Sequence, residues 1–184
     1  MRLNILVPVT TAFSVLAMLA APALADTAAE IDAGVTSARN ACATDVPGCN
    51  DAAEKAQGML VFPSITKGAI GVGGSYGEGA LIVDNKTDGY YSTAAASIGL
   101  QLGGETYSQI IMFMTLEALD EFRNSSGWEV GGNAKVAMID KGKAADVNSI
   151  IANNPVIAFV FGQQGLMGDL SIEGAKVSKL DPDG

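Results

Sequence analysis

The stretch GAIGVGGSYGEG, residues 68–79, decides the fold class of this chain. Glycine inside a strand weakens it, so a cluster of glycines indicates bulges, tight bends or a close approach to the backbone. Ten of the chain's 22 glycines lie in residues 64–104, among short β-rich apolar runs. We therefore predict a curved sheet of short strands joined by turns, with Asp88-Gly89 as one such turn.

The same stretch does not fit a phosphate-binding loop. The spacing of a Rossmann loop would require glycine where Tyr76 stands, and the Gly-Lys-Ser/Thr sequence of a Walker loop is absent. No helix is expected to follow, so no helix N-terminus is available to hold an anion. We expect neither a nucleotide nor another cofactor.

Two helices are predicted before this region. Ile31, Val35, Ala38 and Cys42 form a narrow apolar stripe on a helix over residues 26–44. A second helix is expected from the N-cap Asn50 to about residue 60.

Strands and one further helix are predicted after it. Residues 106–114 are typical of a central strand, and Thr115 is a good N-cap for a helix whose inward positions are Leu116, Leu119 and Phe122. Further strands are expected at 134–139, 156–161, 166–172 and 175–177, with a helical turn near 146–151. The predicted fold class is α+β, with a largely antiparallel, curved, Gly-rich sheet, two N-terminal helices and one inserted helix.

The first 25 residues are typical of a secretory signal peptide. Arg2 precedes an apolar run, and Ala23-Leu24-Ala25 offers the small residues of a cleavage site. A membrane anchor is the alternative, but no cationic stop-transfer patch follows. We expect cleavage after Ala25 and a bacterial periplasmic protein of 159 residues (184 minus 25) at or near a membrane surface. Residues 26–184 would form one domain, with helices over 26–62 and a sheet-rich core over 63–180.

Export changes the expected chemistry of the two cysteines. Cys42 and Cys49 are separated by six residues that include the turn dipeptide Pro47-Gly48. In an oxidising compartment a disulfide is the default, and two thiols are too few for a metal site. We predict a disulfide joining the two N-terminal helices, and no metal site.

Charge and composition exclude several functions. The chain carries 11 Lys and Arg against 20 Asp and Glu, a formal charge of −9, so a nucleic acid is an unfavourable partner. It contains no His, which excludes catalysis that needs imidazole. No carboxylate pair stands out by its spacing, and we expect a binding protein, not an enzyme.

The chain resembles the SYLF lipid-binding domain family over residues 52–180. An ordered set of residues carries this resemblance: Leu60-Val61-Phe62-Pro63, Lys67-Gly68, Gly71, Gly73-Gly74, Tyr76-Gly77-Glu78-Gly79, Tyr91, Ser97, Gly99, Gly103, Phe113-Met114-Thr115, Leu119, Phe122, Trp128-Glu129-Val130-Gly131, Gly165-Leu166 and Glu173-Gly174. The resemblance implies phospholipid binding without chemistry. In some eukaryotic members it also implies an association with actin, which an exported bacterial protein would not meet.

An acidic protein needs local contacts to hold an anionic lipid, because long-range attraction is lacking. Cations near phosphates and aromatic rings at the interface would supply them. The candidate lipid-binding residues are Phe62, Lys67, Tyr76, Lys86, Tyr90 and Tyr91, whereas Trp128 is expected in the core. The alternative is that the chain is a periplasmic structural or stress-related module that binds other proteins; the sequence does not identify these protein partners.

Overall fold

The structure, a computed structural model of the chain, describes residues 26–132, 135–139, 147–165 and 174–183, and the side chains of these residues except 69–72, 97–103 and 165. The described part contains helices α1 (Ala28–Asp45), α2 (Cys49–Ala53), α3 (Leu116–Asn124) and α4 (Val147–Asn153) and strands β1 (Gly58–Val83), β2 (Lys86–Phe113), β3 (Trp128–Glu129), β4 (Ala137–Ile139), β5 (Val156–Gly165) and β6 (Lys176–Leu180). The predicted α+β class is confirmed. The predicted signal peptide and the strand expected at 166–172 lie outside the described residues.

One long antiparallel hairpin dominates the fold. Strands β1 and β2 pair from Gly58 opposite Phe113 to Val83 opposite Lys86. The turn between them is made by Asp84 and Asn85, which adopt φ values of 51° and 58°. Short polar Asp and Asn side chains tolerate this left-handed conformation, and it matches the twist of the two strands. The predicted series of short strands is therefore wrong, and Asp88-Gly89 lies within β2 instead of forming a turn.

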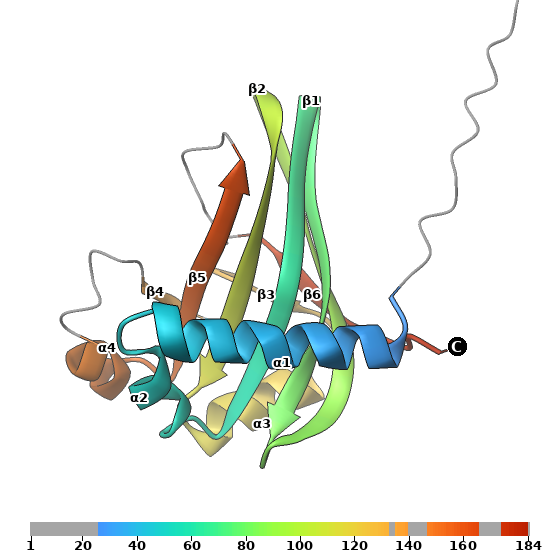
Figure 1. Cartoon of the computed structure of the whole chain (residues 1–184). Coiled ribbons are helices and arrows are strands. Elements are labelled where there is room, and N and C mark those ends of the chain that lie inside the picture. Colours follow the sequence, from blue (N-terminus) through green and yellow to red (C-terminus); the bar gives the residue numbers. More distant parts are fainter. Residues whose placement is uncertain (1–25, 133–134, 140–146, 166–173, 184) are drawn as a thin grey trace, which may run out of the picture.

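The hairpin is folded back on itself. Its register is interrupted between Ile70 and Val72, where Gly71 of β1 lies opposite residues 99–101 of β2. Figure 1 shows that the middle of both strands projects beyond α1, while their ends return to the body of the molecule. The predicted sheet curvature is thus concentrated in one bend.

Two glycines allow the halves of β1 to approach each other. A Cβ atom at Gly77 would lie 2.7 Å from the carbonyl oxygen of Ser64, and one at Gly79 would overlap the carbonyl oxygen of Val61. Such distances exclude any side chain at these positions. The glycines that weaken the strand locally therefore permit the close packing that the fold requires.

The remaining strands extend the hairpin on both sides. In the described residues the order is β3-β6-β2-β5-β4, with β1 also paired to β2. The first half of β2 pairs with β6 and the second half with β5, and only β4 runs parallel to its neighbour. Residues 106–113 pair with both β1 and β5, which confirms the predicted central strand.

Apolar side chains alternate between two cores on opposite faces of the sheet. One core contains Leu60, Ile111 and Phe113 together with Leu119 and Phe122 of α3. The other contains Val61, Ile110 and Met112 beneath the apolar stripe of α1. The alternation follows from the period of two residues in a strand. Helices therefore cover both faces, and none of those in the described residues is long and apolar enough to cross a bilayer.

The N-terminal helices differ from prediction in one respect. α1 has a capping box in which Thr27 and Glu30 satisfy each other's backbone N–H groups, and its stripe is buried as expected. α2 is only five residues long and begins at Cys49 after Gly48, so Asn50 is not its N-cap. The predicted helix does not continue to residue 60, because Met59 and Leu60 pair with β2 instead.

The inserted helix agrees with prediction except at its first residue. The Thr115 side chain accepts a hydrogen bond from the backbone N–H of Ala118, which confirms the predicted N-cap. Leu119 and Phe122 are buried, but Leu116 is 61% exposed and does not face the core. Trp128 is buried beside Phe122, as expected.

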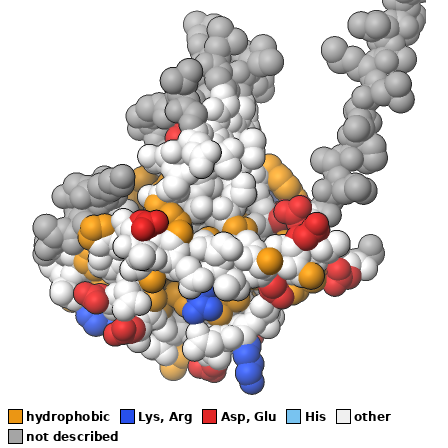
Figure 2. Space-filling model, viewed as in Figure 1, with side chains coloured by type: hydrophobic (Ala, Val, Ile, Leu, Met, Phe, Trp, Pro, Cys, Tyr) orange, Lys and Arg blue, Asp and Glu red, His pale blue; other side chains and the backbone are white. Residues whose placement is uncertain are grey.

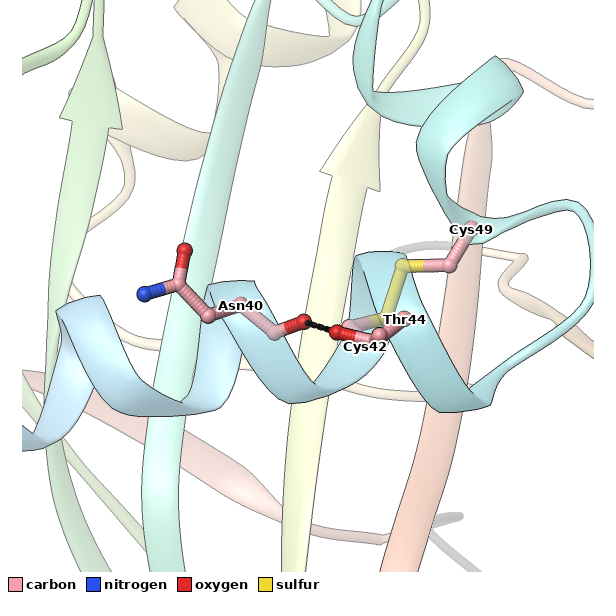
Figure 3. Close-up of a disulfide and its surroundings, with 4 residues drawn as sticks. All are labelled: Asn40, Cys42, Thr44 and Cys49. Atoms are coloured by element: carbon pink, nitrogen blue, oxygen red, sulfur yellow. Dashed lines mark hydrogen bonds between the residues drawn. A yellow bond between two sulfur atoms is a disulfide. The ribbon is translucent and has the colours of Figure 1, made fainter.

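The predicted disulfide is present. Cys42 lies near the end of α1 and Cys49 begins α2, with Cα atoms 5.8 Å apart (Figure 3). Both residues are buried against the second core. The disulfide therefore holds the end of α1 to α2, as expected of a link between the two helices.

The close approach inside β1 predicts a large effect of Gly79→Ala. The added methyl group would overlap the Val61 carbonyl oxygen, which belongs to backbone and cannot rotate away. We expect a loss of about 3 kcal/mol in the free energy of unfolding, measured by urea denaturation. Gly68→Ala is the matched control, because a Cβ at Gly68 meets nothing within 4 Å. Equal stabilities of the two variants would contradict this account of the bend.

Candidate functional site

The six predicted lipid-binding residues lie in three different places. Phe62 is fully buried in the first core, and Tyr91 is buried there against Phe122, with ring centroids 4.9 Å apart. The structure gives both rings a packing role and leaves neither on the surface. Burial of apolar side chains is the commoner reason for an aromatic residue in a strand, and it operates at both positions.

Lys86 and Tyr90 lie near the turn of the hairpin, at its end away from the bend. Tyr90 donates a hydrogen bond from its hydroxyl group to Asp32 of α1, at 3.1 Å, and Thr87 donates to the same carboxylate at 2.9 Å. These contacts attach α1 to the first residues of β2. The structure thus separates Lys86 and Tyr90 from the other predicted cation, Lys67.

Lys67 and Tyr76 flank the projecting bend. Lys67 lies opposite Glu105 in the register of β1 and β2. Tyr76 is 51% exposed and donates a hydrogen bond of 2.6 Å to Glu78. Of the six predicted residues, only these two combine some exposure with a position next to the bend.

The bend belongs to a segment without charged side chains. Residues 68–77 of β1 and their partners 93–104 of β2 include no Asp, Glu, Lys or Arg, and we call these two stretches the hairpin end. Charged side chains resume at Lys67 and Glu78 in β1 and at Glu105 in β2. Figure 2 shows acidic and basic side chains mostly on the body of the molecule, while the described part of the projection is largely white.

Two buried carboxylates lie next to the hairpin end, and sequence reasoning did not find either. Glu78 is 8% exposed and accepts hydrogen bonds from Tyr76 and from the backbone N–H of Asp26. Glu105 is 3% exposed, and its Oε2 has no hydrogen-bond partner among the described residues. Side chains along a strand alternate between its two faces. Applied to β1 and β2, this alternation could have indicated that Glu78 and Glu105 fall on buried faces.

Concave surfaces elsewhere are less suited to a lipid. A cavity of about 270 Å³ is lined by residues of α1, α2 and the sheet, among them Arg39, Met59, Ile110 and Met112. This volume is below the roughly 300–1,000 Å³ of typical small-molecule sites, so it would not enclose a two-chain phospholipid. Arg39 also donates to Asn85, at 2.9 Å.

A second concavity, of about 470 Å³, contains Arg123 and Lys179 beside Tyr91. The Arg123 guanidinium donates two hydrogen bonds to Asp88, at 2.7 and 3.0 Å, and lies 4.0 Å from Asp120. The nearby carboxylates therefore compensate its charge. This reduces the attraction that the concavity offers to a phosphate group.

Residues 94–182 match the family model Ysc84, described as Las17-binding protein actin regulator. The SYLF resemblance is confirmed. A search of curated proteins gives no match. The matched segment begins in β2 and runs through α3 to β6, so it includes half of the hairpin end but none of the six predicted lipid-binding residues. Their assignment to lipid binding stays a prediction.

The four tyrosines of the chain have hydroxyl pKa values above the ordinary value. Burial raises the pKa of Tyr76 to about 12, and the hydrogen bond to the nearby Glu78 carboxylate adds to the effect. Burial also raises the pKa values of Tyr90, Tyr91 and Tyr107 above their usual value of 10. All four hydroxyl groups are therefore protonated at neutral pH, and those of Tyr76 and Tyr90 donate hydrogen bonds to carboxylates.

These shifts predict the alkaline titration of the protein. Ultraviolet absorbance of tyrosinate should show every tyrosine ionising above pH 10, with Tyr76 half-ionised near pH 12. The folded state holds these protons more tightly than the unfolded state, so stability is retained below about pH 10 and falls as the pH rises toward 12. Tyr76→Phe should remove the highest step. A tyrosine that ionises at or below pH 10 in the folded protein would contradict the prediction.

Proposed function

We propose that this SYLF domain is a non-enzymatic phospholipid-binding protein of the bacterial periplasm that meets the membrane through its hairpin end. The family described above suggests a lipid-binding or actin-binding module. The single observation that favours a membrane is the absence of charged residues from the projecting part of a chain whose formal charge is −9.

Electrostatics explains why the location of this segment matters. An anionic membrane surface repels an acidic protein, but the repulsion decays within a Debye length of about 8 Å at physiological salt. Lys67 and Glu105 lie about four residues from the bend, which is about 13 Å along an extended strand. Contact at the bend therefore keeps most carboxylates beyond the screening distance, whereas contact through the body of the molecule would not.

The composition of the hairpin end also suits an interface. Its sequence contains Ile70, Val72, Ile98, Leu100 and Leu102 among glycines and small polar residues. Apolar residues stabilise contact with a bilayer by about 25 cal/mol for each Å² removed from water. Tyr76, which is exposed within the hairpin end, is of the residue type found at the level of lipid headgroups. No bond is made or broken in such an interaction.

A charge introduced at the hairpin end should weaken membrane binding. Ala96 is exposed in β2, and Ala96→Asp would place a carboxylate at the proposed contact. We expect about fivefold weaker flotation with vesicles of phosphatidylethanolamine and phosphatidylglycerol, corresponding to about 1 kcal/mol. Ala33→Asp is the matched control, since Ala33 is exposed on α1 and gives the same change of net charge. Equal effects of the two variants would exclude the hairpin end as the contact.

The two predicted cations can be separated in the same assay. Lys67 flanks the hairpin end, whereas Lys86 lies far from it, directly after the Asp84-Asn85 turn. Lys67→Gln should therefore reduce flotation with anionic vesicles and Lys86→Gln should not. Neither should change flotation with neutral phosphatidylcholine vesicles. If the unaltered protein floats with no vesicle at low salt, the protein-interaction module becomes the better description, and capture of a periplasmic protein partner would then be expected.

A further inference from the structure

The N-terminal end of α1 contacts a buried carboxylate. The backbone nitrogen of Asp26 donates a hydrogen bond of 3.0 Å to Oε2 of Glu78, and the Tyr76 hydroxyl donates one of 2.6 Å to Oε1. Glu78 lies in β1 and is only 8% exposed. In the described part of the chain, both groups that donate to this carboxylate are uncharged while Asp26 remains in a peptide bond.

We propose that hydrolysis of the Ala25–Asp26 bond converts this contact into a salt bridge that locks α1 onto the hairpin. The proposal rests on the signal peptide expected from the sequence and on the periplasmic location in the proposed function. A signal peptidase adds water across the peptide bond, so that Ala25 leaves with a new carboxylate and Asp26 keeps its nitrogen as an amine. Below about pH 8 that amine takes a further proton from solvent and becomes an ammonium group.

The new charge would arise at an atom already in contact with its partner. The Asp26 nitrogen is within hydrogen-bonding distance of Glu78 before cleavage, so the ammonium group needs little movement to pair with it. A buried carboxylate without a cation is costly, and an opposite charge at this distance lowers that cost. Cleavage at a neighbouring bond would place the ammonium group on a different residue and leave the Asp26 nitrogen uncharged.

The surroundings favour a positive charge at this point even though it lies at a helix N-terminus, where the helix dipole opposes cations. Glu78 of β1 accepts hydrogen bonds from the Asp26 nitrogen and from Tyr76, Asp26 has its own carboxylate, and Glu30 accepts a hydrogen bond from the backbone N–H of Thr27, the next residue in the chain. Hydrogen bonds from Thr27 lower the pKa of Glu30, so this carboxylate is ionised at neutral pH. Three carboxylates therefore accompany the new ammonium group.

The link would complete the attachment of α1 at both ends. The Cys42–Cys49 disulfide holds the far end of the helix, and the buried stripe of Ile31, Val35 and Ala38 packs on the sheet between the two links. Disulfide formation and signal cleavage both belong to export. The salt bridge at one end of the helix and the disulfide at the other would thus both form only after the chain has left the cytoplasm.

The test compares the chain that begins at Asp26 with a chain that begins at Ala25, both oxidised and released from a cleavable fusion. Both contain every described element. At pH 6.5 we expect a melting temperature at least about 3 °C higher for the chain that begins at Asp26. The salt bridge raises the pKa of the amine above its usual 7.7–8.0, so the advantage is complete below that range and disappears as the pH rises through the raised value.

Glu78→Gln should abolish the difference between the two chains, whereas Glu121→Gln, at an exposed carboxylate of α3, should preserve it. If Glu78→Gln prevents folding, NMR titration of the reductively methylated α-amine in the unaltered chain decides the question: a pKa above 8.0 supports the lock. Equal melting temperatures with an amine pKa at its ordinary value would overturn it. Mass spectrometry of the exported protein should find Asp26 first, and any other first residue would also overturn it. No lipid enters these assays, so their outcome is independent of membrane binding.

Discussion

The fold depends on the contact between the two halves of β1. An extended hairpin with strands of 26 and 28 residues would leave most of its apolar side chains in water. Folding it back creates an interior, but only if the backbones of the two halves come very close together. Gly77 and Gly79 permit this because any side chain there would overlap the carbonyl oxygens of Ser64 and Val61. The two cores and their covering helices follow from that packing.

Folding the hairpin also divides the molecule into two regions with different chemistry. The body contains both cores, the aromatic cluster around Phe122 and Trp128, and most of the charged side chains. The projecting hairpin end contains none of the four charged residue types. For an acidic protein this separation is more informative than the net charge, because charges interact with a surface only over about a Debye length.

Helix α1 gains its stability from its two ends and from its narrow apolar stripe. An Ala-rich helix with few buried side chains has little hydrophobic area to hold it on a sheet. Three other interactions also hold α1 on the sheet: the hydrogen bond to buried Glu78, the disulfide of Cys42, and the hydrogen bonds that Asp32 accepts from β2. Several of the polar residues that link α1 to the hairpin therefore have structural roles that composition alone does not reveal.

The α+β class, the disulfide, the Thr115 cap and the central strand could be predicted from the amino-acid sequence, because each depends on neighbouring residues or on a short repeating pattern. The continuity of the short β-rich runs as two long strands became evident only in the folded chain, since no local signal distinguishes a bend within a strand from a turn between strands. The burial of Phe62 and Tyr91 in the core, and the separation of Lys67 beside the bend from Lys86 beside the turn, likewise appear only in the folded chain. These features depend on which distant segments meet, because strand pairing and burial bring together residues that are far apart in the chain.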